Sequence, residues 1–66
     1  MRPMSTAELS SLSTALEELT RRVVAIAEDQ QQAKREDVAA DLFAVEGLLD
    51  AARRRLDKAV DATAPP

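Results

Sequence analysis

Apolar residues recur along this chain in two regular blocks that are separated by a short charged stretch. Their steps alternate between three and four residues, so each block forms one apolar stripe on an α-helix, suited to packing against another helix. In the first block the stripe consists of Leu9, Leu12, Leu16, Leu19, Val23, Ile26, Gln30 and Ala33. In the second block it consists of Val38, Leu42, Val45, Leu49, Ala52, Leu56 and Ala59. The pattern predicts two amphipathic helices with these residues in a core or oligomer interface.

The two stripes do not continue each other. Extending the first spacing would place Asp37 and Gly47 at core positions, so the pattern breaks near Arg35. The charge reverses at the same point, from Lys34 and Arg35 to Glu36 and Asp37. Cations stabilise the C-terminal end of a helix and anions its N-terminal end, because the backbone dipoles leave partial charges there. These residues therefore indicate the end of one helix, a tight turn and the start of the next.

The fold class that follows is all-α, an antiparallel two-helix hairpin of the coiled-coil type. We predict a flexible N-terminus over residues 1–4, a hairpin over 5–62 and a C-terminal tail over 63–66. Within the hairpin, the first helix covers about 5–34, the turn about 34–37 and the second helix about 37–62. The alternative is one rod-like helix of about 55 residues, with a phase slip inside a longer coiled coil. The lack of Gly, Asn or Pro in the charged stretch favours that alternative.

The start of the first helix carries a recognisable capping pattern. Ser5 is followed three residues later by Glu8, the arrangement in which each side chain accepts a hydrogen bond from the other residue's free backbone N–H. Met4 and Leu9 occupy the flanking positions of a hydrophobic staple. These features place the expected N-cap at Ser5.

The chain is too short to form a large core. A domain of this size buries only about 60% of its unfolded surface and usually needs disulfides, a metal or oligomerisation. The 66 residues include no Cys and no His, so disulfides are excluded and any metal would need carboxylates alone. No carboxylates are spaced as in a calcium loop. We therefore expect a homodimer of hairpins that forms a four-helix bundle.

A second stripe on the later helix contains mostly small residues. Ala40, Ala44, Gly47 and Ala51 step by four, three and four, and Phe43, the only aromatic residue, lies beside them. A glycine within a helix costs about 1 kcal/mol relative to alanine, which makes Gly47 noteworthy. One interpretation is an ordinary exposed face. The other is a second contact surface for a symmetry mate or for a different protein.

The sequence lacks the residues that enzymes use. Ser10, Ser11, Ser13 and Thr14 have no neighbouring base and are expected to face solvent. Acidic residues occur as sequence neighbours, which point about 100° apart on a helix and do not converge. Gly47 is the only glycine, so no phosphate-binding loop is present. We therefore expect no catalytic residues, no metal site, no cofactor and no enzymatic activity.

Charged residues are interleaved, with a net charge of −3, which argues against general binding to nucleic acid or to an anionic membrane. Two ion pairs at helical spacing are expected, Glu17 with Arg21 and Glu18 with Arg22. The candidate anion contact, which also suits the end of the second helix, is formed by Arg53, Arg54, Arg55 and Lys58.

These observations favour a small helical interaction protein that self-associates and docks a partner protein as a regulator or accessory subunit. The alternative is a regulator that contacts nucleic acid or a nucleotide through Arg53, Arg54 and Arg55. A third possibility is that the chain folds only with a different protein, as one half of a mixed bundle. The N-terminal residues lack the apolar run of a signal peptide and no stretch is long enough to span a bilayer, so we expect a cytoplasmic location.

Overall fold

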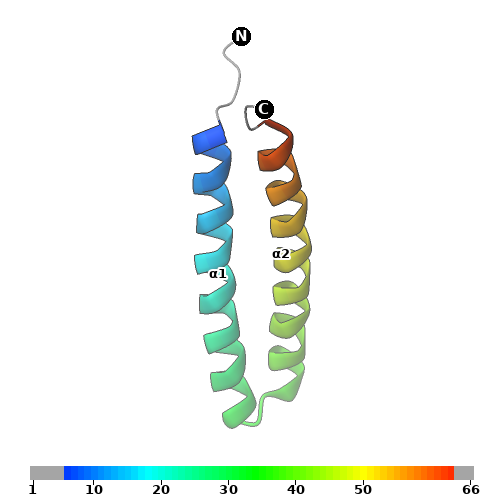
Figure 1. The fold of residues 1–66 in the computed structure, drawn as a ribbon. Coiled ribbons are helices and arrows are strands. Elements are labelled where there is room, and N and C mark those ends of the chain that lie inside the picture. Colours follow the sequence, from blue (N-terminus) through cyan, green and yellow to red (C-terminus); the bar gives the residue numbers. More distant parts are fainter. Residues whose placement is uncertain (1–5, 64–66) are drawn as a thin grey trace.

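The computed structural model describes residues 6–63 and consists there of two long helices, α1 (Thr6–Gln32) and α2 (Glu36–Thr63). They lie side by side and run in opposite directions, with both ends of the described chain at the same end of the molecule (Figure 1). The predicted all-α hairpin is therefore confirmed, and the single rod is excluded. The expected N-cap at Ser5, the N-terminal residues 1–4 and the tail residues 64–66 lie outside the described residues.

The turn closes α1 with the hydrogen bonds of a Schellman motif. The backbone N–H of Lys34 donates to the carbonyl oxygen of Gln31 at 3.1 Å, and that of Arg35 donates to Gln30 at 2.9 Å. Lys34 adopts a left-handed backbone conformation with φ of 63°. Glycine or asparagine usually fills this position, because a Cβ atom disfavours it. Their absence suggested a continuous rod, but Lys34 takes the left-handed conformation that the hydrogen bonds of the turn require.

The second helix starts immediately after this turn. The carbonyl oxygen of Arg35 accepts a hydrogen bond from the N–H of Ala39 at 3.0 Å, so Arg35 belongs to both the end of the turn and the cap of α2. Glu36 and Asp37 occupy the first turn of α2, where negative charge complements the helix dipole. The charge reversal in the sequence therefore marks the boundary between the helices.

The basic residues near the C-terminus lie earlier in α2 than the dipole interpretation requires. The last turn of α2, which ends at Thr63, contains no basic residue. Lys58 lies more than one turn before that end, and Arg53, Arg54 and Arg55 lie further back. The prediction that these four residues serve the helix terminus is therefore wrong, because the dipole effect falls off within the last turn.

Two polar contacts fix the register between the helices. The hydroxyl of Ser13 donates to Asp57, and Arg53 lies 3.7 Å from the carboxylate of Glu17. From the first contact to the second, the position in α1 moves four residues forward and the position in α2 moves four residues back. This relation assigns a level in α2 to every residue of α1.

The interior of the hairpin is narrow. Among residues 6–63 only Ala27 and Ala39, with 0% and 3% of their surface exposed, are buried. The radius of gyration is 15.3 Å, whereas a compact chain of this length has about 11 Å. A hairpin with only two small buried side chains has little hydrophobic stabilisation of its own.

Candidate protein interaction surface

Six large hydrophobic side chains remain exposed in the part of the hairpin that the structure describes. They come from both helices and have between 38% and 71% of their surface accessible. They are Leu12 (48%), Leu19 (44%), Ile26 (52%), Val38 (40%), Val45 (38%) and Leu48 (71%). Five of them belong to the two apolar stripes expected from the sequence.

Only part of each apolar stripe joins the inner row, the buried or half-buried side chains that face the other helix, and the rest forms an exposed row. In α1 the half-buried or buried row contains Leu9, Ser13, Leu16, Thr20, Val23, Ala27 and Gln30. In α2 it contains Ala39, Leu42, Glu46, Leu49, Arg53, Leu56 and Val60. Leu12, Leu19 and Ile26 of α1, together with Val38, Val45, Ala52 and Ala59 of α2, stay outside this contact.

This division changes the expected pairing across the hairpin. The sequence pattern suggests that Leu12, Leu19 and Ile26 pack directly onto α2, but each keeps more than two fifths of its surface exposed. Ser13, which was expected to face solvent, instead reaches across to Asp57. The inner row of α1 keeps every other residue of the expected stripe, but Ser13, Thr20 and Ala27 replace the residues that precede them.

The two exposed rows lie on the same face of the hairpin. In both helices the exposed row precedes an inner row by one residue, as Leu19 precedes Thr20 and Val45 precedes Glu46. Two antiparallel helices are related by a two-fold axis perpendicular to the plane that contains both helix axes. This rotation exchanges the helices but keeps the front face of the hairpin at the front. Equal offsets therefore bring both rows to one side, which we call the apolar face: Leu12, Leu19, Ile26, Val38, Val45, Ala52 and Ala59.

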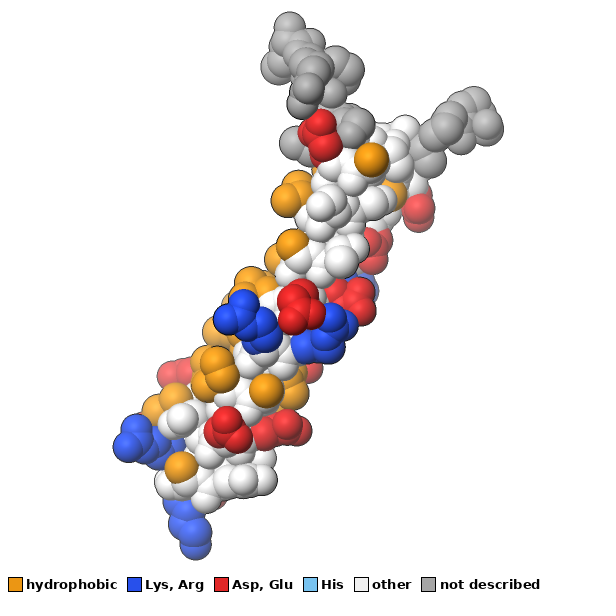
Figure 2. Space-filling model, turned by 90° about the vertical axis from the view of Figure 1, so that its left-hand side faces the viewer, with side chains coloured by type: hydrophobic (Ala, Val, Ile, Leu, Met, Phe, Trp, Pro, Cys, Tyr) orange, Lys and Arg blue, Asp and Glu red, His pale blue; other side chains and the backbone are white. Residues whose placement is uncertain are grey.

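The space-filling view agrees with this placement. Figure 2 shows hydrophobic side chains gathered along one long edge of the hairpin, where some charged side chains interrupt them, while most carboxylates lie across the middle and along the other edge. No position of the apolar face carries a charge, although 32% of the chain is charged. A row of exposed hydrophobic side chains along a helix pair is suited to contact with another helical surface.

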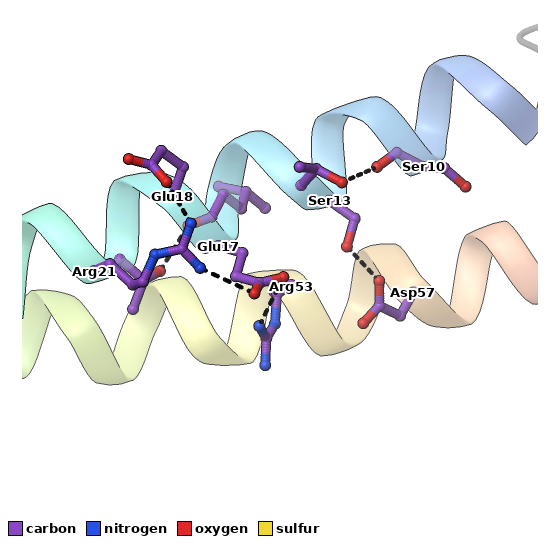
Figure 3. A network of polar contacts seen from close by, with 10 residues as sticks. Ser10, Ser13, Glu17, Glu18, Arg21, Arg53 and Asp57 are labelled. Carbon is purple, nitrogen blue, oxygen red and sulfur yellow. Dashed lines mark hydrogen bonds and ion pairs between the residues drawn. The ribbon is translucent and has the colours of Figure 1, made fainter.

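A network of polar contacts lies on the opposite side of the helix pair (Figure 3). Arg21 binds Glu17 at 3.1 Å and also contacts Glu18, so the expected pair of Glu18 with Arg22 is replaced by one with Arg21. Hydrogen bonding to Glu18 and its charge, followed by the contributions of Glu17, raise the pKa of Arg21 above its ordinary value. Arg53 joins the network through Glu17. On α1, this side is therefore polar and exposed.

The stripe of small residues faces away from α1. Ala40, Ala44, Gly47 and Ala51 are exposed, and a Cβ atom at Gly47 would meet no atom within 4 Å. Phe43 is half-buried and, with Gln31, Glu36, Ala39 and Ala40, lines a shallow hollow of about 430 Å³ beside the turn. Within the hairpin, therefore, no neighbouring helix requires a glycine at position 47.

The basic run does not act as one group. Arg53 is only 35% exposed and lies against Glu17. Arg54, Arg55 and Lys58 are exposed and line, with Ala51, a second hollow of about 280 Å³. Three aspartates alternate with these four cations between residues 50 and 61, so the local field is weak. The aspartates are Asp50, Asp57 and Asp61.

Over residues 6–63, no group of three or more acidic, histidine or cysteine side chains could hold a metal ion. Neither α1 nor α2 has an apolar stretch sufficient to cross a membrane. Comparisons with protein-family models, with curated proteins and with solved structures found no match to this chain.

Proposed function

We propose that this protein is a non-enzymatic interaction module that self-associates through its apolar face and docks a partner protein with its remaining surface. The observation that carries the proposal is the uncovered apolar face, together with the burial of only Ala27 and Ala39 in the described hairpin. A second hairpin laid on this face would complete a four-helix bundle, in which the half-buried row of each helix also becomes fully covered.

The size of the face supports this arrangement. The 27 residues of α1 rise about 1.5 Å each, which gives a length of about 40 Å, and two helices side by side are about 20 Å wide. The resulting area is on the order of 800 Å² on each copy, which is what a stable protein–protein interface buries per partner. A second copy therefore offers enough contact to offset the entropy lost on association.

A matched pair of variants tests the self-association. Replacing Leu19 and Ile26 of the apolar face by Glu places two carboxylates in the proposed interface, where burial of an unpaired charge is costly. Ala44→Glu adds a carboxylate to the exposed small-residue stripe instead. In sedimentation experiments at micromolar concentration we expect the wild-type chain and Ala44→Glu to be dimeric and Leu19→Glu/Ile26→Glu to lose the dimer. A folded wild-type monomer would contradict the proposal.

The partner-docking part of the proposal concerns the side that a bundle leaves free. Phe43 and its hollow lie on the side opposite to the apolar face, and an aromatic side chain beside a hollow is a common anchor at protein interfaces. We expect Phe43→Ala to keep the dimer but to reduce the recovery of a cellular partner in affinity purification with mass spectrometry. If the wild-type chain and Phe43→Ala recover the partner equally, Phe43 is not part of the docking surface.

A further inference from the structure

The edge of the apolar face on α2 carries a sequence that can pair with itself in the reverse direction. Asp41, Leu48 and Arg55 are spaced by seven residues, so they lie in one row along this helix. Each directly precedes a residue of the inner row of α2, as Leu48 precedes Leu49. Each also follows an apolar-face residue by three positions, as Leu48 follows Val45. All three are exposed, and among residues 6–63 Leu48 is the most exposed large hydrophobic residue, at 71%.

From this row we propose that two copies pack with their turns at opposite ends, so that α2 lies antiparallel to α2 of the second copy around Leu48. This inference rests on the self-association proposed above and specifies its geometry. A two-fold axis at Leu48 brings each Asp41 to Arg55 of the second copy, because the two residues are equally far from Leu48 in opposite directions. Two ion pairs then flank a central contact between the two Leu48 side chains.

The same axis matches large side chains with small ones inside the interface. Within one residue of this register, Val45 faces Ala52 of the second copy and Val38 faces Ala59. Alternation of large and small residues across facing helices allows close interdigitation. Leu48 also lies near the middle of α2 (Glu36–Thr63), so the two helices overlap along nearly their whole length.

The other bundle geometry, with both turns at the same end, lacks these contacts. It stacks α1 of one copy on α2 of the other, and the register set by Ser13 with Asp57 and Glu17 with Arg53 then places Asp29 level with Asp41. Two carboxylates would face each other on both edges of the bundle, which is unfavourable.

The opposite-end geometry has one unfavourable contact of its own. On the α1 edge, the same register brings Arg22 beside Arg22 of the second copy. Arg22 is exposed, and its long side chain can turn its charge into water. The two ion pairs between Asp41 and Arg55 and the burial of Leu48 on the α2 edge outweigh the repulsion of this single arginine pair.

Charge reversal distinguishes the two geometries. In the opposite-end dimer, Asp41→Arg places a new guanidinium group against Arg55 of the other copy in two symmetric contacts, and we expect the dissociation constant to rise on the order of tenfold. Arg55→Asp acts in the same sense, and the double variant Asp41→Arg/Arg55→Asp restores wild-type affinity. In the same-end dimer, Asp41→Arg would relieve repulsion from Asp29 and tighten the dimer, which would overturn the inference.

Cross-linking provides an independent readout. The natural chain has no cysteine, so Leu48→Cys introduces a single thiol in each copy. With a short bis-maleimide we expect efficient covalent dimers of Leu48→Cys, and few of the control Ala44→Cys on the small-residue stripe. If Leu48→Cys sediments as a dimer but does not cross-link, the opposite-end geometry is wrong while self-association stands. If the wild-type chain is a folded monomer, the proposed function itself fails.

Discussion

Lys34 holds the position in this chain where the backbone reverses direction. Its φ of 63° lies in the left-handed region, which costs an L-residue with a Cβ atom about 1–2 kcal/mol. The N–H groups of Lys34 and Arg35 compensate by donating to carbonyl oxygens in the last turn of α1 that would otherwise lack a partner. The reversal therefore depends on backbone hydrogen bonds and not on a specialised turn residue.

Because this conformation suits glycine, we expect Lys34→Gly to raise the free energy of unfolding. The gain is about 1 kcal/mol, since relief of the left-handed strain exceeds the extra chain entropy that glycine brings to the unfolded state. Urea denaturation followed by circular dichroism measures it. Lys34→Ala is the control, because it removes the same charge but keeps the Cβ atom. Equal stabilisation by both variants would attribute the effect to charge.

At the scale of the helices, the spacing of apolar residues and the charge reversal after Arg35 together predicted two helices and the turn between them. These features were not sufficient to predict the rotation of the helices. A stripe with steps of three and four covers two neighbouring lines of residues along the helix, and rotation of the helix decides which line faces α2. Leu9 and Leu12 lie on different lines. The inner row, which contacts α2, includes Leu9 but not Leu12. It also includes Ser13 and Thr20, whose small polar side chains give no signal in a hydrophobic pattern.

The candidate site was predictable in the same partial way. The residues of the apolar face were recognised as core or interface positions, but their exposure became visible only once the inner rows were assigned. The engagement of Arg53 by Glu17 depends on contacts between residues distant in sequence, which no local spacing contains. The self-complementary row of Asp41, Leu48 and Arg55 is present in the sequence, but only the orientation of α2 shows that it borders the apolar face.

The two sides of α2 are expected to contribute unequally to stability. Leu49 is half-buried in the seam shared by α1 and the proposed dimer, whereas Phe43 lies on the side away from that interface. We expect Leu49→Ala to lower the free energy of unfolding by about 2–4 kcal/mol, because it leaves a cavity in the bundle core. Phe43→Ala, although it removes a larger side chain, should cost less than about 1.5 kcal/mol.

Urea unfolding of both variants at one protein concentration makes this comparison. Sedimentation of Phe43→Ala under the same conditions should still show the dimer. A larger loss of stability in Phe43→Ala than in Leu49→Ala would move the main interface to the small-residue stripe of Ala40, Ala44, Gly47 and Ala51.

The molecule as a whole is an elongated hairpin, 50 Å long and 14 Å thick, without a large buried side chain among its described residues. A layer of this thickness covers each helix on one side only. The backbone of every ordered residue still costs about 1–2 kcal/mol of conformational entropy. Folding and association are therefore expected to occur together, because in the proposed dimer most contacts that stabilise the helices lie between copies.

Coupling of folding to association has a direct consequence for thermal stability. If the native state is the dimer and the unfolded state is a single chain, a hundredfold increase in protein concentration adds about 2.7 kcal/mol to the stability of the folded state. We expect the midpoint of thermal unfolding, followed by circular dichroism, to rise steadily between about 2 and 200 µM. A folded monomer would instead melt at one temperature throughout. Weak helical signal at every concentration would identify a chain that folds only with a different protein, since neither its own second helix nor a second copy would then suffice to cover the apolar face.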